Sequence, residues 1–315
     1  MSVEFHHISV MPSETIDGLV TDLSGIYVDC TLGGAGHSRL IADRLNEDGR
    51  LIGIDQDAAA IEAATERLAD CRCRVNIVRE NFSNLARVLD DLNVDKVNGI
   101  LFDLGVSSHQ LDAAQRGFSY IQDAPLDMRM DQQAGFSAYD VINKYDEKEL
   151  CRIFKEYGEE RWYKRIAQFI VAERKKAPVK TTGELVDIIK KAVPAAVRSA
   201  KGGHPAKRIF QAVRIEVNNE LGILEEAFRA AVGRLKPGGR IAIITFHSLE
   251  DRIAKTVLKK MSSGCICPPT MPVCVCNHKP EIKLLLKGVV ASAKELESNS
   301  RAKSAKLRIA EKLNN

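Results

Sequence analysis

A glycine-dense turn and two later acids have the types and spacing of a cofactor site. The turn lies within residues 28–38 (VDCTLGGAGHS), where it follows a short apolar run and ends in His37. Asp55 ends the next apolar run, 22 residues after Gly33, and Asp103 ends a later one in the phrase FDLGVSS. Bare backbone lets a ligand approach closely, and an acid after a strand can accept hydrogen bonds from both ribose hydroxyls. The pattern indicates a nucleoside-containing cofactor.

Two cofactor classes share that arrangement, and the details favour one of them. A dinucleotide fold uses G-x-G-x-x-G at the start of a helix, but Ala35 stands where the second glycine is expected. The phrase LKPGG before a late apolar run is typical of class I methyltransferases. Alternating segments near residue 315 and an acid at Asp103 are typical of the same enzymes. We therefore expect S-adenosylmethionine rather than NAD.

Composition and charge limit the remaining function classes. The 315 residues are 45% hydrophobic and 28% charged, and no apolar run approaches the roughly 20 residues of a membrane span. The sequence starts without a signal-peptide pattern, so we expect a cytoplasmic protein whose eight cysteines stay reduced. Residues 151–214 carry 16 Lys and Arg against 6 Asp and Glu, although the whole chain is only +4. This segment is either a polyanion-binding surface or a set of solvated helix faces.

The elements that must position these residues are strands and helices in alternation. Apolar runs rich in β-branched residues predict strands at 26–29, 50–55, 74–79 and 98–104, with helices at 38–45 and 58–69 between them. Such alternation predicts an α/β fold with a parallel sheet covered on both faces. The alternation then stops, and helical periodicity predicts helices at 147–157, 160–175 and 182–193.

After the helical stretch, the pattern of the first third returns. A helical segment at 219–235 leads into the buried-strand signature RIAIITF. Two alternating segments, 283–290 and 304–311, predict antiparallel edge strands, with a polar loop at 291–303. We expect a discontinuous core, 1–109 and 215–315, interrupted by a helical, basic domain at 110–214.

Five phrases together resemble one family. They are DCTLGGAGHS, FDLGVSSHQLD with RGFSY, PLDMRMD, GGHPAKRIFQAVRIEVNNEL and ITFHSLEDRI. The chain is similar to the bacterial family that methylates the N4 amino group of a cytidine in 16S ribosomal RNA. The resemblance implies S-adenosylmethionine as cofactor and a Rossmann-like class I methyltransferase sheet, mainly parallel with an antiparallel last strand. It also implies that the inserted domain recognises 16S RNA, in the small ribosomal subunit or its precursor. The oligomeric state stays open, a homodimer being one option.

The resemblance also assigns site residues. Cofactor contacts fall on Gly34, Ala35, Gly36, His37, Asp55, Phe82, Asp103 and Gln110. His37 would bind the methionyl carboxylate or cap the following helix, and Phe82 would stack on adenine or serve as a hydrophobic plug. The resemblance implies that several relatives carry Gly at the position of Ala35, and we expect alanine to be tolerated there if its φ is not positive. The residues expected to contact RNA phosphates are Arg129, Lys207, Arg208 and Arg214, although Arg208 and Arg214 could instead pair with neighbouring acids.

Asp103 is the expected catalytic residue. The N4 lone pair of cytosine is delocalised into the ring, and a carboxylate that accepts an N–H bond localises it and stabilises the positive charge that develops on nitrogen. A structural reading, in which Asp103 caps a helix, stays open. Many amino-group methyltransferases have an aromatic residue shortly after this acid, but Val106 stands here. Phe246 and His247 are candidates to compensate.

Four cysteines remain unexplained in CICPPTMPVCVCNH, as two C-x-C pairs. Four thiolates can bind tetrahedral zinc, but structural zinc sites usually use C-x₂₋₄-C. A C-x-C pair on a strand would also send its sulfurs to opposite faces. We therefore expect no metal site. Two other functions compete with the main hypothesis: a methyltransferase for DNA or protein, and a catalytically silent RNA-binding assembly factor.

Overall fold

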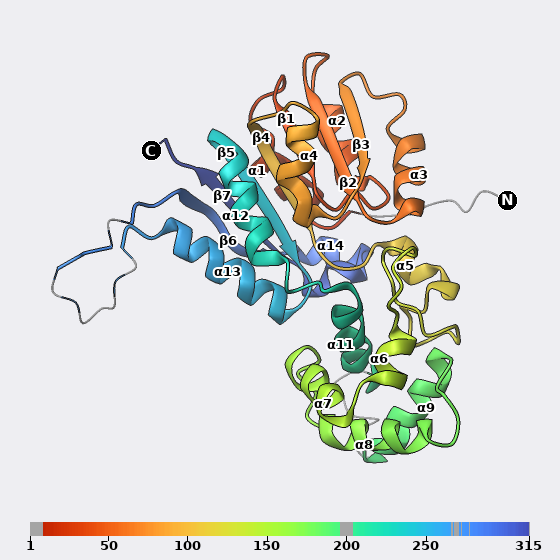
Figure 1. The fold of residues 1–315 in the computed structure, drawn as a ribbon. Helices are drawn as coiled ribbons and strands as arrows, with labels where there is room; N and C mark the ends of the chain where they lie inside the picture. Colours follow the sequence, from red (N-terminus) through yellow and green to blue (C-terminus); the bar gives the residue numbers. More distant parts are fainter. Residues whose placement is uncertain are drawn as a thin grey trace. The chain divides into compact units, whose positions relative to one another are not determined.

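The structure is a computed structural model that describes residues 9–195, 204–265, 267, 271, 273–276 and 278–314. The chain divides into two compact units (Figure 1). Unit 1 is Met1–Gly105 with Gly222–Asn315, and unit 2 is Val106–Leu221. These limits lie a few residues from the expected 109/110 and 214/215 boundaries. The second limit falls later because α11 (Ala206–Asn218) continues without a break past Arg214.

Unit 1 is built around one seven-stranded sheet with flanking helices. Its strands are β1 (Ile26–Asp29), β2 (Arg50–Asp55), β3 (Arg74–Arg79), β4 (Val97–Asp103), β5 (Leu235–Thr245), β6 (Ile282–Val290) and β7 (Lys306–Lys312). Its helices are α1 (Pro12–Leu19), α2 (Gly36–Arg44), α3 (Ala58–Arg67), η1 (Phe82–Asn84), α4 (Leu85–Asp91), α12 (Leu224–Arg234), α13 (Ser248–Ser262), α14 (Ala293–Ser298) and η3 (Ser300–Ser304). The first four strands lie within one residue of their predicted limits.

The strand order is β3-β2-β1-β4-β5-β7-β6. β1 to β5 pair in parallel, whereas β7 runs antiparallel to both of its neighbours. The predicted Rossmann-like, mainly parallel sheet is confirmed. One detail differs: β7 was expected at an edge but lies inside the sheet, paired on both sides, and β6 is the edge strand.

Alternating strand residues build a core on each face of the sheet. Tyr27, Leu101 and Ile309 belong to one buried cluster that includes residues of α1, α2 and α3. Phe102, the next residue after Leu101, points to the other face, where its ring meets Phe228 of α12 edge-on at 5.2 Å. Because neighbouring strand residues face opposite ways, both layers of helices are held by the same short apolar strands.

Unit 2 is helical. Its elements are α5 (Ser108–Asp112), η2 (Ala114–Arg116), α6 (Ala138–Lys144), α7 (Glu147–Glu156), α8 (Tyr163–Arg174), α9 (Thr182–Ala192) and α11. Their apolar faces meet in a second core that includes Phe154, Ile170, Ile189 and Phe210. Three of the predicted helices appear here as α7, α8 and α9, and three capping boxes, at Ser137, Asp146 and Thr181, begin α6, α7 and α9.

Two other expectations are corrected. The segment 291–303 was expected to be a loop but holds α14 and η3, whose first turns are capped by the side chains of Ser292 and Asn299. The helix expected at 219–235 begins only at Leu224, because Asn219 takes a left-handed conformation (φ 49°) that ends α11. Within the described ranges, no helix is long and apolar enough to cross a membrane.

Candidate functional site

The carboxyl ends of β1 and β4 form the point where the strand order of unit 1 reverses. The chain builds outward from β1 to β3 and then returns to place β4 on the other side of β1. Loops diverge at such a point, and ligands of open α/β sheets bind just outside it. Asp29 ends β1, Asp55 ends β2 and Asp103 ends β4, so three carboxylates lie at this end of the sheet.

The turn after β1 is held in a conformation that favours glycine. Gly33 and Ala35 have φ values of 47° and 55°, and Ala35 is fully buried. The condition placed on Ala35, that it should avoid positive φ, is therefore not met. The alanine takes a left-handed conformation that costs an L-residue roughly 1–2 kcal/mol. Ala35 is the N-cap of α2, which begins at Gly36. The backbone N–H groups of the first turn of a helix have no partner within the helix.

Asp55 closes this turn onto β2. One carboxylate oxygen accepts the Gly33 N–H at 2.8 Å and the other accepts the Asp57 N–H at 2.9 Å. Burial outweighs these two bonds and raises the pKa of Asp55 to about 6. An ionised carboxylate has about four acceptor positions, so each oxygen keeps capacity for a further donor. Asp55 thus orders the glycine turn and still offers two acceptors.

Asp29, which the sequence analysis did not single out, anchors a buried polar network. One oxygen accepts from the Ser38 hydroxyl at 2.7 Å, and the other accepts from the Thr31 N–H at 3.1 Å. The Thr31 hydroxyl in turn accepts the backbone N–H of Asp103 at 2.6 Å. Burial raises the pKa of Asp29 although the Ser38 bond opposes the shift. The signal was present in the sequence, because Asp29 ends an apolar run just as Asp55 and Asp103 do.

His37 lies between these acids with both ring nitrogens engaged. Nε2 is 2.9 Å from the Val10 carbonyl oxygen, and Nδ1 is 3.2 Å from an Asp103 carboxylate oxygen. Both partners are acceptors, so both nitrogens must carry a proton to bond them, and the ring is then an imidazolium. Burial alone would lower the pKa of His37, but Asp103, Asp29 and the Val10 carbonyl together raise it. These contacts are not those of a helix cap, and the predicted contact of His37 with the methionyl carboxylate stays a prediction.

Asp103 has one oxygen occupied and one open. Oδ2 faces His37, whereas Oδ1 is buried with no hydrogen-bond partner among the described residues. A buried acceptor without a donor costs roughly 1–3 kcal/mol, so such atoms need an explanation. A ligand N–H or O–H that reaches Oδ1 would remove this cost. The side chain pairs with His37 rather than with a helix N-terminus, which leaves the capping alternative without support.

Two aromatic residues lie at the same end of the sheet. Phe82 begins η1, is half-buried, and sets its ring edge-on against Phe102 at 5.6 Å. Phe246 follows β5, and its ring lies beside Gly105, where an added Cβ would be 3.5 Å away. His247 is the N-cap of α13, and its side chain pairs with Glu250 in a capping box. His247 is thus used locally, while adenine stacking by Phe82 stays a prediction.

The remaining predicted residues belong to unit 2. Gln110 is buried and bonds locally: its side-chain oxygen accepts the Ser107 N–H at 3.1 Å, and its own N–H donates to the Ser107 hydroxyl at 3.2 Å. This exchange fixes the start of α5. These local bonds do not test the predicted contact between Gln110 and the cofactor, which stays a prediction.

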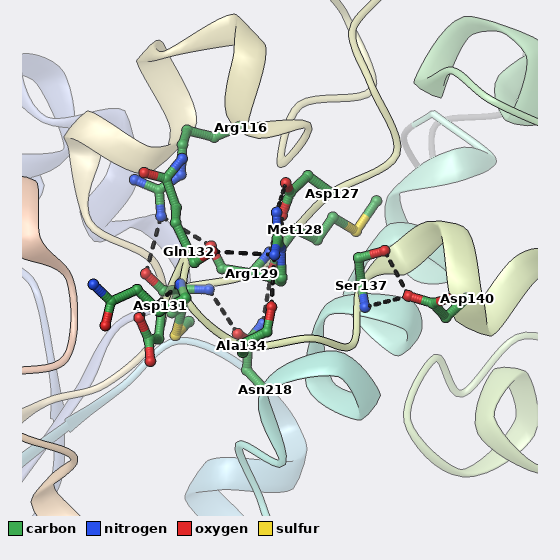
Figure 2. A network of polar contacts seen from close by, with 12 residues as sticks. Arg116, Asp127, Met128, Arg129, Asp131, Gln132, Ala134, Ser137, Asp140 and Asn218 are labelled. Atoms are coloured by element: carbon green, nitrogen blue, oxygen red, sulfur yellow. Dashed lines mark hydrogen bonds and ion pairs between the residues drawn. The ribbon is translucent and has the colours of Figure 1, made fainter.

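Arg129 is tied into its own loop, which opposes the predicted phosphate contact. Its Nε and Nη2 donate to the two carboxylate oxygens of Asp127 at 2.8 and 2.6 Å, and Nη1 donates to the carbonyl oxygens of Gln132 and Ala134 (Figure 2). Four of the five guanidinium N–H groups are then used inside the protein. The aspartate two residues earlier in PLDMRMD was a visible signal for this pairing.

Arg214 is likewise paired. Its Nε and Nη2 donate to the two carboxylate oxygens of Glu220 at 2.8 and 2.9 Å, and its side chain is 15% exposed. The alternative left open in the sequence analysis, pairing with a neighbouring acid, is therefore the observed one. Lys207 and Arg208 differ, because both are exposed on the first turn of α11, where Arg208 donates to the Glu159 carbonyl oxygen at 3.2 Å. They remain the phosphate candidates.

The cysteine-rich segment differs from the strand assumed in the sequence analysis, in which the two sulfurs of each C-x-C pair would point to opposite faces. The sulfurs of Cys265, Cys267, Cys274 and Cys276 all lie within 4.8 Å of one another. The described residues of the segment have no strand conformation, so a C-x-C pair can turn both sulfurs to one side.

Comparison with known proteins identifies the chain's relatives. A model of the MraW methylase family matches residues 4–313. Proteins named "Ribosomal RNA small subunit methyltransferase H" from Clostridioides difficile (strain 630) and Clostridium botulinum (strain Loch Maree) are 55% and 56% identical over 312 residues, which cover 99% of this chain and 100% of each relative. A protein of the same name from Brevibacillus brevis is 55% identical over 313 residues, 99% of both chains.

The imidazolium of His37 predicts a pH-dependent contribution to stability. Because the folded-state pKa of His37 is raised above 6.5, its stabilisation is present below that pH and is lost as pH rises through the folded pKa. The difference in unfolding free energy between wild type and His37→Gln should therefore shrink from acidic to alkaline pH. Denaturant unfolding across that range measures it.

His204→Gln is the matched control with the opposite sign. Burial lowers the pKa of His204, and its Nδ1 accepts the Ala206 N–H at 3.2 Å, so the neutral ring stabilises the fold. Its contribution should be lost as pH falls below 6.5. Equal pH profiles for the two variants would contradict the assignment of a protonated His37.

Proposed function

The chain belongs to the MraW methylase family, and on that premise we propose that it transfers a methyl group from S-adenosylmethionine to the N4 amino group of a cytidine in 16S ribosomal RNA. The observation that carries the proposal is Asp103, which ends β4 and whose buried Oδ1 has no hydrogen-bond donor among the residues that the structure describes. Ribosomal RNA as the substrate would place the activity in the cytoplasm.

The residues at the ends of β1 and β2 fit the cofactor. S-adenosylmethionine supplies an electrophilic methyl group on a sulfonium. The spare acceptor positions of Asp55 suit the two ribose hydroxyls, because both carboxylate oxygens already lie beside the glycine turn. The free N–H groups at the start of α2 suit the methionyl carboxylate, since a helix N-terminus attracts an anion. Phe82, half-buried after β3, suits the adenine ring.

Asp103 would act on the amino group of the base. Its open oxygen can accept an N4–H bond, which draws the lone pair out of the aromatic ring and toward the methyl group. As the new C–N bond forms, the bond between the methyl group and the sulfonium sulfur would break and leave a neutral thioether. The positive charge that develops on N4 is stabilised by the same carboxylate, which can also accept the N4 proton that is lost. The surrounding network fixes that oxygen, because His37 holds Oδ2 and Thr31 holds the Asp103 backbone. The carboxylate therefore needs little reorganisation during the reaction.

Unit 2 would supply the RNA-binding surface. Residues 151–214 have a net charge of +10, whereas the net charge of the whole chain is only +4. Two of the predicted phosphate ligands, Arg129 and Arg214, each form a bidentate pair with an acid of the protein. The other two, Lys207 and Arg208, are exposed on α11 and have no such pair among the described residues. Such charges attract RNA of any sequence, and specificity for one cytidine must come from contacts to bases.

The function is tested on ribosomal RNA from cells with and without the gene. We expect N4-methylcytidine in 16S RNA nucleosides of the wild type, its loss in the deletion strain, and its return with the wild-type gene. Asp103→Ala should fail to restore it, because loss of one preorganised acceptor slows transfer by ~10²- to 10³-fold. Mass spectrometry of the nucleosides is the measurement, and Asp91→Asn, an exposed acid on α4, is the control that should restore the mark. A deletion strain that keeps N4-methylcytidine would refute the proposal, as would methyl acceptance by DNA or protein alone.

The raised pKa of Asp55 predicts how cofactor binding depends on pH. Ribose hydroxyls bond the ionised carboxylate best, so affinity for S-adenosylmethionine should rise as pH increases through about 6. Asp55→Asn should bind more than about tenfold more weakly at neutral pH, because charge-assisted bonds of roughly 1.5–3 kcal/mol are lost. It should also lose that pH dependence. Calorimetric titration measures both, and an unchanged affinity in Asp55→Asn would remove this residue from the ribose site.

RNA binding should depend steeply on salt if unit 2 is the docking surface. Each neutralised phosphate releases counterions, so replacing Lys207 and Arg208 together with Ala should flatten the slope of log K against log salt by about one to two units. Affinity for S-adenosylmethionine should not change. The control pair is Lys255 and Lys259, exposed on α13 of unit 1. If the control pair flattens the slope and the α11 pair does not, the RNA path lies elsewhere.

A further inference from the structure

Four cysteines of unit 1 meet in a single cluster outside the site described above. Cys265 and Cys267 lie on the segment that leaves α13, and Cys274 and Cys276 lie on the segment that returns toward β6. The Cys265 sulfur is 3.4 Å from that of Cys274 and 3.8 Å from that of Cys276, and the last two sulfurs are 3.5 Å apart. Two C-x-C pairs, far apart in the loop, thus present all four sulfurs to one point.

These separations match one metal ion rather than disulfides. A disulfide needs its sulfurs about 2.05 Å apart, well below the distances observed. Four thiolates bound tetrahedrally to zinc at about 2.3 Å from the ion stand about 3.8 Å from one another, by the geometry of a tetrahedron. All four sulfurs here lie within 4.8 Å of one another. A four-iron cluster would spread its cysteines over four different iron atoms and so set them farther apart.

The backbone supports charged sulfurs at this point. The N–H of Cys267 is directed at the Cys265 sulfur at 3.4 Å. Hydrogen bonds of this kind orient a metal ligand and stabilise its negative charge. Because the described residues of the loop are not a strand, both members of each pair can face the ion, which removes the geometric objection to C-x-C spacing.

The described apolar residues of the loop contribute little burial to holding its shape. Its described apolar side chains point into solvent: Met271 is 46% exposed, Val273 68% and Val275 64%. At its base, the Glu281 N–H donates to the Met261 carbonyl oxygen at 2.8 Å. A His278 ring nitrogen lies 3.1 Å from the Lys260 carbonyl oxygen. Among the described residues beyond the base, these apolar side chains are not ordered by burial, and the cysteine cluster is the feature that could cross-link the segment.

We propose that Cys265, Cys267, Cys274 and Cys276 form a structural zinc site that closes the loop between α13 and β6. All four positions around the ion are filled by protein sulfur, which is the mark of a structural rather than a catalytic zinc site. Soft thiolate ligands in tetrahedral array select zinc over magnesium or calcium. The site is independent of the cofactor residues and of the methyl transfer proposed above.

The test is the metal content of the full-length protein, purified under reducing conditions without chelators. Elemental analysis should find about one zinc per chain. A mercurial reagent that blocks thiols should release that zinc to a colorimetric indicator, and Co²⁺ exchanged into the site should show the intense visible absorption of a tetrahedral thiolate complex. Cys265→Ser and Cys274→Ser should each lower the zinc retained after dialysis by about tenfold or more.

Matched controls come from cysteines outside the cluster. Cys71→Ser and Cys151→Ser remove half-buried thiols and should keep the full zinc content. The wild-type release assay decides the question even if a variant fails to fold. The proposal is overturned if the wild type holds no zinc and takes up none from solution, if the four cysteines are found as disulfides in the reduced preparation, or if the cluster variants retain zinc as the controls do.

Discussion

The site in unit 1 depends on the buried imidazolium of His37, which lies between the buried Asp29 and the partly buried Asp103. Asp29 and Asp103 end adjacent parallel strands, where two carboxylates would repel each other at low solvent exposure. His37, 4% exposed, supplies the compensating charge and reaches Asp103 directly. The same ring bonds the Val10 carbonyl, so the segment before α1 is fastened to the sheet by the interaction that balances the acids. The glycine turn is followed directly by α2, whose first turn carries His37 to this position.

That arrangement explains why an alanine tolerates a left-handed conformation after β1. α2 must begin at Gly36 for His37 and Ser38 to face inward on its first turn, and this requires a positive φ at Ala35. Ser38 then bonds Asp29 while His37 reaches Asp103. The strain at one residue is offset by two buried polar contacts, and the N–H groups of α2 are left open toward the end of the sheet where ligands bind.

The fold and the acids of the site were predictable from the sequence, and the partners of the polar side chains were not. Three of the first four strands are apolar runs that end in Asp29, Asp55 or Asp103, so strand limits and carboxylates were visible together. The contacts of His37 join residues 27 and 66 positions away, which local patterns do not reveal. β7 was placed at an edge because its polar and apolar residues alternate, yet pairing on both sides buries most of it.

The position of β7 inside the sheet has a consequence for synthesis of the chain. β5 and β6 leave the ribosome first but cannot pair with each other, since β7 separates them in the finished sheet. Until residues 306–312 emerge, both strands carry unpaired backbone groups along a whole edge, and such edges invite pairing with other chains. At roughly 5–20 residues per second, the interval between β6 and β7 is only seconds long. β7 therefore covers the open edge of β5 and one edge of β6, and the nascent protein remains open to misassembly until that strand arrives.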